Sequence, residues 1–171
     1  MVRQLAGYLA AHDAPADVEV SFRVDVGPAV LRGQVDRVEH REAGLHIVDF
    51  KTGAARPERD VAHRNPQLGA YQLAAAGGAF TPQSHAAEAG GEARTAGASL
   101  VFVAVNKNVT VREQPPLHED PEPWAQEMIE EAARVVSAAT FPARPSKACA
   151  HCPVRHACPA REEGIRLGEE G

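Results

Sequence analysis

Apolar and polar residues alternate along the first third of the chain, with the two-residue period of a β-strand. The clearest run covers residues 18–26, where the apolar positions are Val18, Val20, Phe22, Val24 and Val26. A Gly-Pro dipeptide at 27–28 predicts a turn. Two more β-like runs follow at residues 30–39 and 45–51, and the polar residues between them end in Gly44. This arrangement predicts a β-hairpin.

Helical spacing of apolar residues predicts helices at residues 2–12 and 121–139. The later helix is the more regular of the two, with Trp124, Met128, Ala132 and Val135 on one side. A third helix is predicted between them by its boundary residues. Asn65 is suited to the N-cap, Pro66 to the first helical position, and the Gly pair at 77–78 to the C-terminal end.

Two further strands are predicted in the second half of the chain. Residues 100–105 form a continuous apolar run, which is typical of a strand buried on both faces, and residues 109–113 would pair with it across a turn at 106–108. Residues 81–98 are rich in Gly, Ala and Glu without periodicity, which indicates a flexible insertion. The order helix, three strands, helix, two strands, helix predicts an α/β sandwich around a mixed sheet.

Composition divides the chain into one core domain, residues 1–140, and a tail rich in Pro and Cys, residues 141–171. No stretch approaches the roughly 20 apolar residues that cross a membrane, and the first residues do not resemble a signal peptide, so we expect a cytoplasmic protein without membrane contact. The net charge of -5 argues mildly against a surface built to bind phosphates without sequence preference. Carboxylates that hold a divalent metal would contribute to this negative sum.

Two carboxylates are brought together if the hairpin turns so that His40 pairs with Leu45. Counting outward from that pair places Asp36 opposite Asp49, at the roughly 5 Å that separates facing side chains. Two buried carboxylates repel each other unless a cation lies between them, and Mg²⁺ or Mn²⁺ prefers such oxygen ligands. The pair therefore predicts a divalent metal site.

Lys51 follows Asp49 by two residues, so strand geometry sends both side chains to the same face. A metal clamp beside a cation that can reach an attacking water or a phosphate oxygen suits phosphodiester hydrolysis. Taken alone, the three residues also fit an exposed charged face whose ion pair contributes little. Against that alternative, apolar residues flank Asp49 on both faces of its strand, which indicates burial.

The segments GQVDRVE at 33–39 and IVDFKTG at 47–53 resemble the core of the RecB-type branch of the PD-(D/E)xK nucleases, where a GxxDR motif precedes DYKTG. NPQLGAYQL at 65–73 resembles the QxxxY helix that follows in this branch, with Gln67 and Tyr71 on one helix face. By themselves these two residues fit an ordinary half-buried helix. Glu19 lies where an acidic residue begins the first strand in this branch. The resemblance covers about residues 18–160 and implies a restriction-endonuclease-like mixed sheet flanked by helices.

The resemblance also implies an activity and the residues that perform it. The chain would be a Mg²⁺- or Mn²⁺-dependent deoxyribonuclease, acting on single-stranded DNA or duplex ends beside a UvrD-type helicase, in DNA end processing and recombinational repair. The metal ligands would be Asp36, Asp49 and the main-chain carbonyl of Phe50. Lys51 would orient or help to deprotonate the attacking water, while Gln67 and Tyr71 would contact substrate or support Lys51.

Three cysteines, Cys149, Cys152 and Cys158, lie within ten residues near the end of the chain. An odd, clustered set is a poor disulfide framework and suits a metal or an iron–sulfur cluster. Spacing alone leaves open structural zinc with His151 or His156 as fourth ligand, and also unmodified thiols. Helicase-nucleases of the AddAB and AdnAB kind and Cas4-like nucleases have three cysteines in this pattern, and a fourth upstream completes a [4Fe–4S] cluster. The resemblance therefore implies such a cluster.

The chain departs from that family pattern on its N-terminal side. It has no upstream cysteine, and neither His12 nor His63 occupies the position of the family's metal-binding histidine. We therefore expect the chain to be a C-terminal piece of a longer helicase-nuclease. Two alternatives stay open: a nuclease-like scaffold that holds DNA or a helicase without cutting, and a small zinc-bound structural protein.

Overall fold

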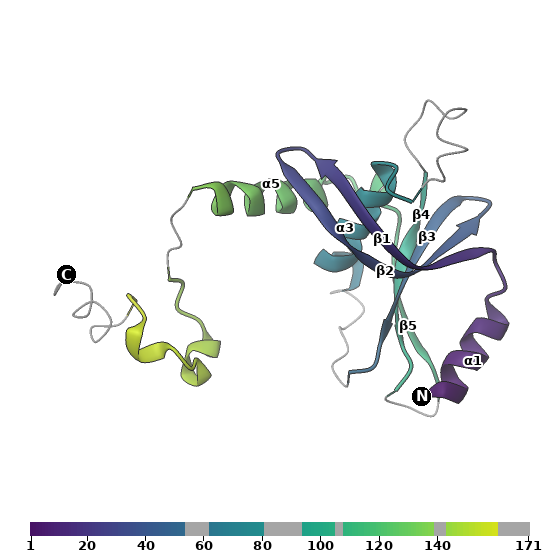
Figure 1. Cartoon of the computed structure of the whole chain (residues 1–171), viewed down its shortest axis with the longest axis horizontal. Coiled ribbons are helices and arrows are strands. Elements are labelled where there is room, and N and C mark those ends of the chain that lie inside the picture. Colours follow the sequence, from purple (N-terminus) through teal and green to yellow (C-terminus); the bar gives the residue numbers. More distant parts are fainter. Residues whose placement is uncertain (54–61, 81–93, 105–107, 139–142, 161–171) are drawn as a thin grey trace. The chain divides into compact units, whose positions relative to one another are not determined.

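The computed structural model describes residues 1–53, 62–80, 94–104, 108–138 and 143–160 (Figure 1). The chain divides into two compact units, Met1–Ala133 and Arg134–Gly171. The first unit contains the sheet and the helices that cover it, and the second contains the three cysteines. The candidate catalytic residues all belong to the first unit.

The elements follow the predicted order. The helices are α1 (Val2–Ala11), α3 (Pro66–Ala76) and α5 (Trp124–Ser137), and short 3₁₀ turns are η1 (Leu117–Glu119), η2 (Lys147–His151) and η3 (Arg155–Ala157). The strands are β1 (Ala16–Val26), β2 (Ala29–Arg41), β3 (Gly44–Lys51), β4 (Thr95–Phe102) and β5 (Thr110–Gln114). The sequence did not indicate the 3₁₀ turns, which are too short to leave a periodic pattern.

The five strands form one mixed sheet in the order β1-β2-β3-β4-β5. Neighbours pair antiparallel except β3 and β4, which are parallel and are connected through α3. The predicted α/β architecture with a mixed sheet is therefore confirmed. The parallel pair positions the site, because the end of β3 and the helix that follows it meet on one side of the sheet.

Helices cover opposite faces of this sheet (Figure 1). On the α3 side, fully buried residues from four elements form the larger core: Val35, Val38, Ile47, Leu68, Ala98 and Leu100. On the α1 side, Tyr8 packs with Val48, Val101 and Val103. Both faces of β3 are consequently buried, as its apolar pattern predicted. Any polar side chain on β3 must therefore find a partner inside the fold.

The predicted boundaries hold closely for the helix after the hairpin. The Asn65 side chain accepts a hydrogen bond from the Leu68 amide at 3.1 Å, with Pro66 in the first turn and Gly77 as C-cap. The start of β4 was predicted too late, because it begins at Thr95 instead of Leu100. Its first residues are small and polar and pair with β3 through a β-bulge, so no apolar run marks them. Residues 81–93 of the expected insertion lie outside the described residues.

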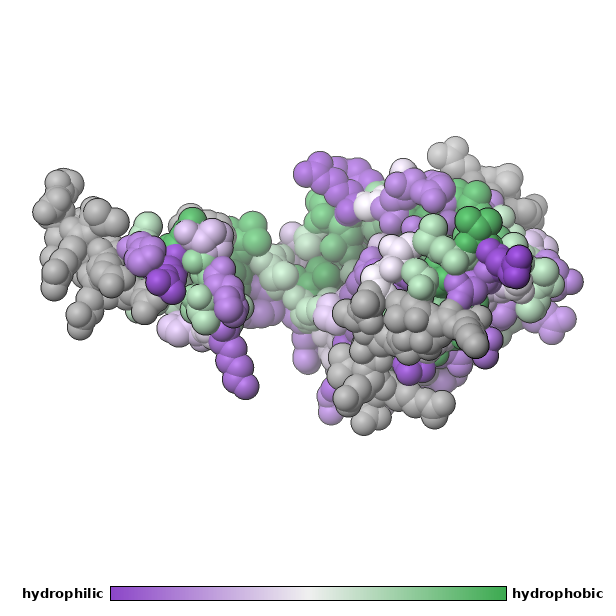
Figure 2. All heavy atoms as spheres, turned by 90° about the horizontal axis from the view of Figure 1, so that it is seen from below, coloured by the Kyte–Doolittle hydropathy of each residue, from purple (hydrophilic) through white to green (hydrophobic). Residues whose placement is uncertain are grey.

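The molecular surface mixes hydrophilic and hydrophobic residues on the face seen in Figure 2. Among the described residues, no helix has both the length and the apolar character that a membrane span requires.

Close packing between α3 and α5 gives a test of this fold. A Cβ atom at Gly69 would lie 2.5 Å from the Trp124 ring. We expect Gly69→Ala to lower the free energy of unfolding by about 1–2 kcal/mol, since overpacking outweighs the helix-propensity gain. Gly7→Ala is the matched control, because Gly7 lies within α1 with no atom within 4 Å of the added methyl. It should raise stability by about 0.5–1 kcal/mol. Urea denaturation measures both, and equal effects would contradict the packing.

Candidate functional site

The hairpin of β2 and β3 positions the two carboxylates. His40 pairs with Leu45 as predicted, and the ladder runs inward from that pair to Arg37 opposite Val48. Beyond that pair β2 and β3 no longer pair, and the Asp36 carboxylate accepts a hydrogen bond from the main-chain amide of Phe50 at 2.7 Å. Asp36 is thus anchored to the residue that follows Asp49.

Asp49 is buried, with its side chain 7% exposed. Its Oδ1 accepts a hydrogen bond from the Gln67 amide at 2.8 Å, and its Oδ2 lies 2.7 Å from the Lys51 ammonium. Burial raises the pKa of Asp49 above its ordinary value and the negative charge of Asp36 raises it further, while Lys51 opposes both effects. The positive charge of Lys51 therefore compensates the ionised Asp49 carboxylate only in part.

Helix α3 supplies the groups that close the site. Lys51 donates a hydrogen bond to the Gln67 side-chain oxygen at 2.8 Å, and the Gln67 amide also donates to the Tyr71 hydroxyl at 2.9 Å. Tyr71 in turn donates to the main-chain carbonyl of Gln34 on β2 at 3.2 Å. The structure thus joins Asp49, Lys51, Gln67 and Tyr71 in one continuous network. Gln34 had no predicted role, because a main-chain acceptor leaves no signal in the sequence.

The donor set fits a hard divalent cation in part. Asp49 Oδ2 is buried and pairs with the Lys51 ammonium at 2.7 Å, which leaves a second lone pair of that oxygen for a metal. Carboxylate oxygens of Asp36 and Asp49 are the ligands that Mg²⁺ or Mn²⁺ prefers, and water or phosphate oxygens complete such sites. Within the described part of the chain, no three His, Cys, Asp or Glu side chains surround a single ion position.

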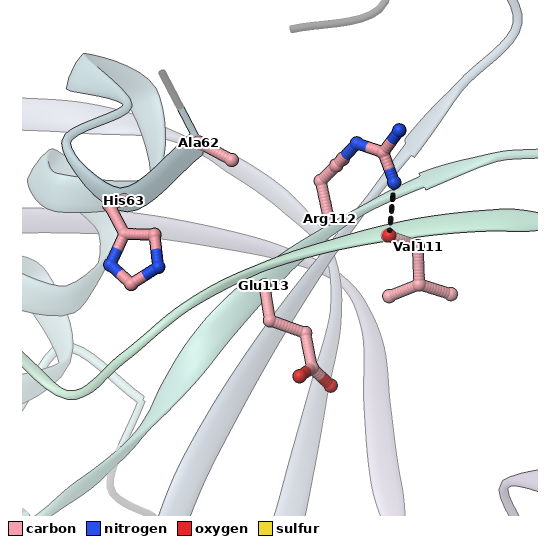
Figure 3. Close-up of a pocket in the computed structure, with 5 residues that line it drawn as sticks. All are labelled: Ala62, His63, Val111, Arg112 and Glu113. Atoms are coloured by element: carbon pink, nitrogen blue, oxygen red, sulfur yellow. Dashed lines mark hydrogen bonds between the residues drawn. The ribbon is translucent and has the colours of Figure 1, made fainter. Parts of the chain in front are cut away.

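Two histidines considered as metal ligands have other surroundings. The His12 ring stacks on Tyr8 with centroids 4.0 Å apart, and its Nδ1 lies 2.8 Å from the Tyr8 carbonyl. His63 lines a cavity of about 510 Å³ with Val111, Arg112 and Glu113 (Figure 3). The structure therefore associates His12 with α1 and His63 with β5, and brings neither into the network around Asp49.

A buried ion-pair network behind the site was not predicted. Glu39 is 1% exposed and accepts hydrogen bonds from Arg37 and Arg41. Burial alone would raise the pKa of Glu39, but these two arginines outweigh it and hold the pKa below its ordinary value. Burial and the Glu39 charge together raise the pKa of Tyr8 to about 12. Arg37 of this network also donates to the main-chain carbonyls of His12 and Ala14, which fixes the strand that bears Asp36 to the segment after α1.

The three cysteines lie in the second unit and form no disulfide. All three line one cavity of about 600 Å³, together with Arg144 and Arg155. The Cys149 sulfur also accepts a hydrogen bond from the Ser146 amide at 3.2 Å. They share one cavity, but the described residues do not bring them around one ion position. Thiolate ligands beside arginines would still suit a cluster, because a cluster is larger than an ion and carries negative charge.

Comparison with known proteins agrees with this geometry. The model of the PD-(D/E)XK nuclease superfamily matches residues 1–159. The chain therefore belongs to that superfamily, a class of metal-dependent phosphodiesterases. A solved structure described as "Crystal structure of SSO0001" has the same fold, with a TM-score of 0.50 and 19% identity. That match covers 91% of this chain and 65% of the other. No curated protein matches the chain.

The buried charge of Asp49 gives a test that needs no substrate. Since burial raises its pKa, the ionised carboxylate destabilises the fold at neutral pH, and this penalty disappears as pH falls through the raised pKa. We expect Asp49→Asn to stabilise the metal-free protein by about 0.5–2 kcal/mol at neutral pH. The gain should vanish toward the ordinary carboxyl pKa. Denaturant melts over pH measure it, with the exposed Asp25→Asn as control.

A gain that persists unchanged to low pH, or an equal gain for Asp25→Asn, would show that the Asp49 charge is not the cause.

Proposed function

We propose that the chain is a Mg²⁺- or Mn²⁺-dependent DNA exonuclease module of a helicase-nuclease, active in DNA end processing and recombinational repair. One observation carries the proposal: the motif residues Asp49, Lys51 and Gln67 are in direct contact with one another. Asp36 accepts a hydrogen bond from the main-chain amide of Phe50, the residue after Asp49. An exposed charged face would not bury Asp49 or hold Lys51 through a helix.

The residues divide the work of hydrolysis between them. A bound divalent cation would polarise the scissile phosphate and lower the pKa of a ligated water. Asp36, Asp49 and the main-chain carbonyl of Phe50 would hold that cation. Lys51 is 33% exposed, so its ammonium group can reach the attacking water or the charge that develops on the phosphate.

Gln67 and Tyr71 act as supports in this scheme. Gln67 accepts a hydrogen bond from Lys51 and donates one to Asp49, so it fixes the distance between the Lys51 ammonium and the Asp49 carboxylate. Tyr71 ties Gln67 to β2 through the Gln34 carbonyl. Their positions favour a role in holding Lys51, and Tyr71 is also partly exposed, so it could contact substrate.

The superfamily and the chain's charge support the proposed substrate and partner. Superfamily membership favours DNA as substrate. The net charge of -5 is unfavourable for strong independent binding of a polyanion, so we propose that a UvrD-type helicase, in the same or a partner chain, delivers the strand. The chain spans 65% of the length of the similar solved structure.

We further propose that Cys149, Cys152 and Cys158 ligate a [4Fe–4S] cluster, with zinc as the alternative. None of the residues described between 143 and 160 is buried, so no apolar core orders this segment. Small segments without a core usually require a disulfide or a metal. The shared cavity offers three sulfur ligands and two arginines, and the fourth ligand would come from outside these residues.

A second candidate function has an observation in its favour. The described residues supply only two carboxylates to the site and no histidine. A scaffold that holds DNA or a helicase without cutting would need no complete metal shell. Catalysis and scaffolding differ in whether any cleavage depends on Asp49.

Replacing the site carboxylates separates the two functions. We expect Asp49→Ala and Asp36→Ala to reduce Mn²⁺-dependent cleavage of labelled single-stranded DNA by a factor of about 10²–10³ or more, because each removes a metal ligand. Lys51→Ala should cause a comparable loss. Asp25→Ala, an exposed change on β1, should leave cleavage intact. Metal-dependent cleavage that survives in Asp49→Ala would contradict the nuclease assignment, and its absence in the unaltered chain favours the scaffold.

Anaerobic purification tests the cysteine site. A [4Fe–4S] cluster would give a brown protein with broad absorbance near 400 nm, and Cys152→Ser should remove most of it. A colourless protein with bound zinc would overturn the cluster assignment and favour the structural zinc site. Cys152 is partly buried and lines the cavity, whereas Val154→Ala changes an exposed residue of the same segment that does not line it and serves as the control.

A further inference from the structure

Glu19 has a backbone conformation that side chains rarely adopt. Its φ of +52° makes it the only residue other than glycine with positive φ among those described. The left-handed conformation costs a non-glycine residue of order 1 kcal/mol or more, and it persists only where the surroundings enforce it. Glu19 lies inside β1, where an ordinary strand residue would be extended, so the strand bends there.

The strand pairing shows what the bend changes. Val18 pairs with Arg37 and Val20 pairs with Val35, but the pair between them, Glu19 with Asp36, is missing from the ladder. The interruption thus falls at the candidate metal ligand. It is the only gap in the otherwise continuous register of β1 and β2.

At this step the side chains of both strands also switch from one face of the sheet to the other. Val20 and Val35 pack into the core on the α3 side. Two residues away, Arg37 points to the other side, where it donates to the carbonyls of His12 and Ala14 after α1. Residues two apart on a regular strand share one face, so the alternation is reversed at Glu19 and Asp36.

This reversal frees the Phe50 amide for Asp36. Extending the register of β2 and β3 by one hydrogen-bonded pair would give the Phe50 amide to the Val35 carbonyl. The ladder stops at Arg37, and the Asp36 carboxylate takes that amide at 2.7 Å instead. The bend therefore separates β2 from β3 at the point where Asp36 reaches across toward Asp49.

Contacts from the site hold the bend in place. The Gln34 side chain donates to the Glu19 carbonyl at 3.2 Å, and the Gln34 carbonyl accepts from Tyr71. The Glu19 side chain itself is exposed. The strained main chain at Glu19 is thus connected through Gln34 to Tyr71 and the network around Asp49.

We propose that Glu19 is a positioning residue whose left-handed backbone, and not its carboxylate, sets Asp36 beside Asp49. The proposal deepens the nuclease function and rests on it for any effect on cleavage. Its structural part, the Asp36–Phe50 hydrogen bond, stands independently of activity. If the Glu19 carboxylate ligated the metal directly, Glu19→Gly, Glu19→Asn and Glu19→Gln would lose Mn²⁺ affinity as Glu19→Val does.

Substitutions at position 19 separate backbone from carboxylate. Gly and Asn adopt positive φ readily, Gln keeps the length without the charge, and Val strongly resists the left-handed region. We expect Glu19→Gly, Glu19→Asn and Glu19→Gln to keep Mn²⁺ affinity, measured by electron paramagnetic resonance, and kcat within about threefold. Glu19→Val should lose both by tenfold or more. Ser21→Val, an exposed change two residues along β1, controls for a β-branched residue.

Amide hydrogen exchange at Phe50, followed by nuclear magnetic resonance, reads the geometry directly. A hydrogen bond to a charged acceptor is worth about 1.5–3 kcal/mol, so its loss should speed exchange at least tenfold. We expect fast exchange in Glu19→Val and in the reference Asp36→Ala, and slow exchange in Glu19→Gly and Glu19→Asn.

The outcomes distinguish the two proposals. If Glu19→Gly, Glu19→Asn and Glu19→Gln all lose Mn²⁺ affinity while Phe50 stays protected, the carboxylate is a ligand and the positioning role is wrong. Unchanged exchange in a folded Glu19→Val also overturns it. If Phe50 responds as expected but the unaltered chain cleaves no DNA, the positioning role stands and the nuclease function fails.

Discussion

A carboxylate buried beside another carboxylate is the constraint on which the rest of the structure depends. Asp49 lies at the end of a strand covered on both faces, with its side chain 7% exposed. One ammonium group at 2.7 Å offsets part of the charge. Folding tolerates such an arrangement where later binding of a cation recovers the cost. The site thus holds an unfavourable charge that a bound divalent metal would relieve.

The surrounding architecture holds this charge in place from two directions. On one side, α3 is fixed by its capped start and by buried amides, since Gln72 and Gln114 bond to each other and to main-chain carbonyls. On the other side, Arg37 and Glu39 attach β2 to the segment after α1. These anchors hold the two elements from which Gln67 and Asp36 reach β3.

The sequence predicted what periodicity and local motifs encode. Strand alternation and the polar turn fixed the pairing of His40 with Leu45, and Asn65 with Pro66 located the helix that bears Gln67. Neither the early start of β4 nor the reversal at Glu19 could be predicted, because the first lacks an apolar run and the second contradicts the alternation itself. Glu19 occupies a regular polar position in the pattern. Only the structure reveals its conformation, through the positive φ and the missing pair with Asp36.

The cysteine segment, residues 143–160, is not stabilised by apolar burial as the sheet is. In the first unit, buried Val, Ile and Leu side chains offset the entropy of ordering the chain. Residues 143–160 bury no side chain fully and are organised by short 3₁₀ turns. Turns of this length are not stable in isolation. A segment of this kind keeps a defined structure only through a stronger link, and the three cysteine sulfurs that line one cavity are the groups through which the proposed link would form.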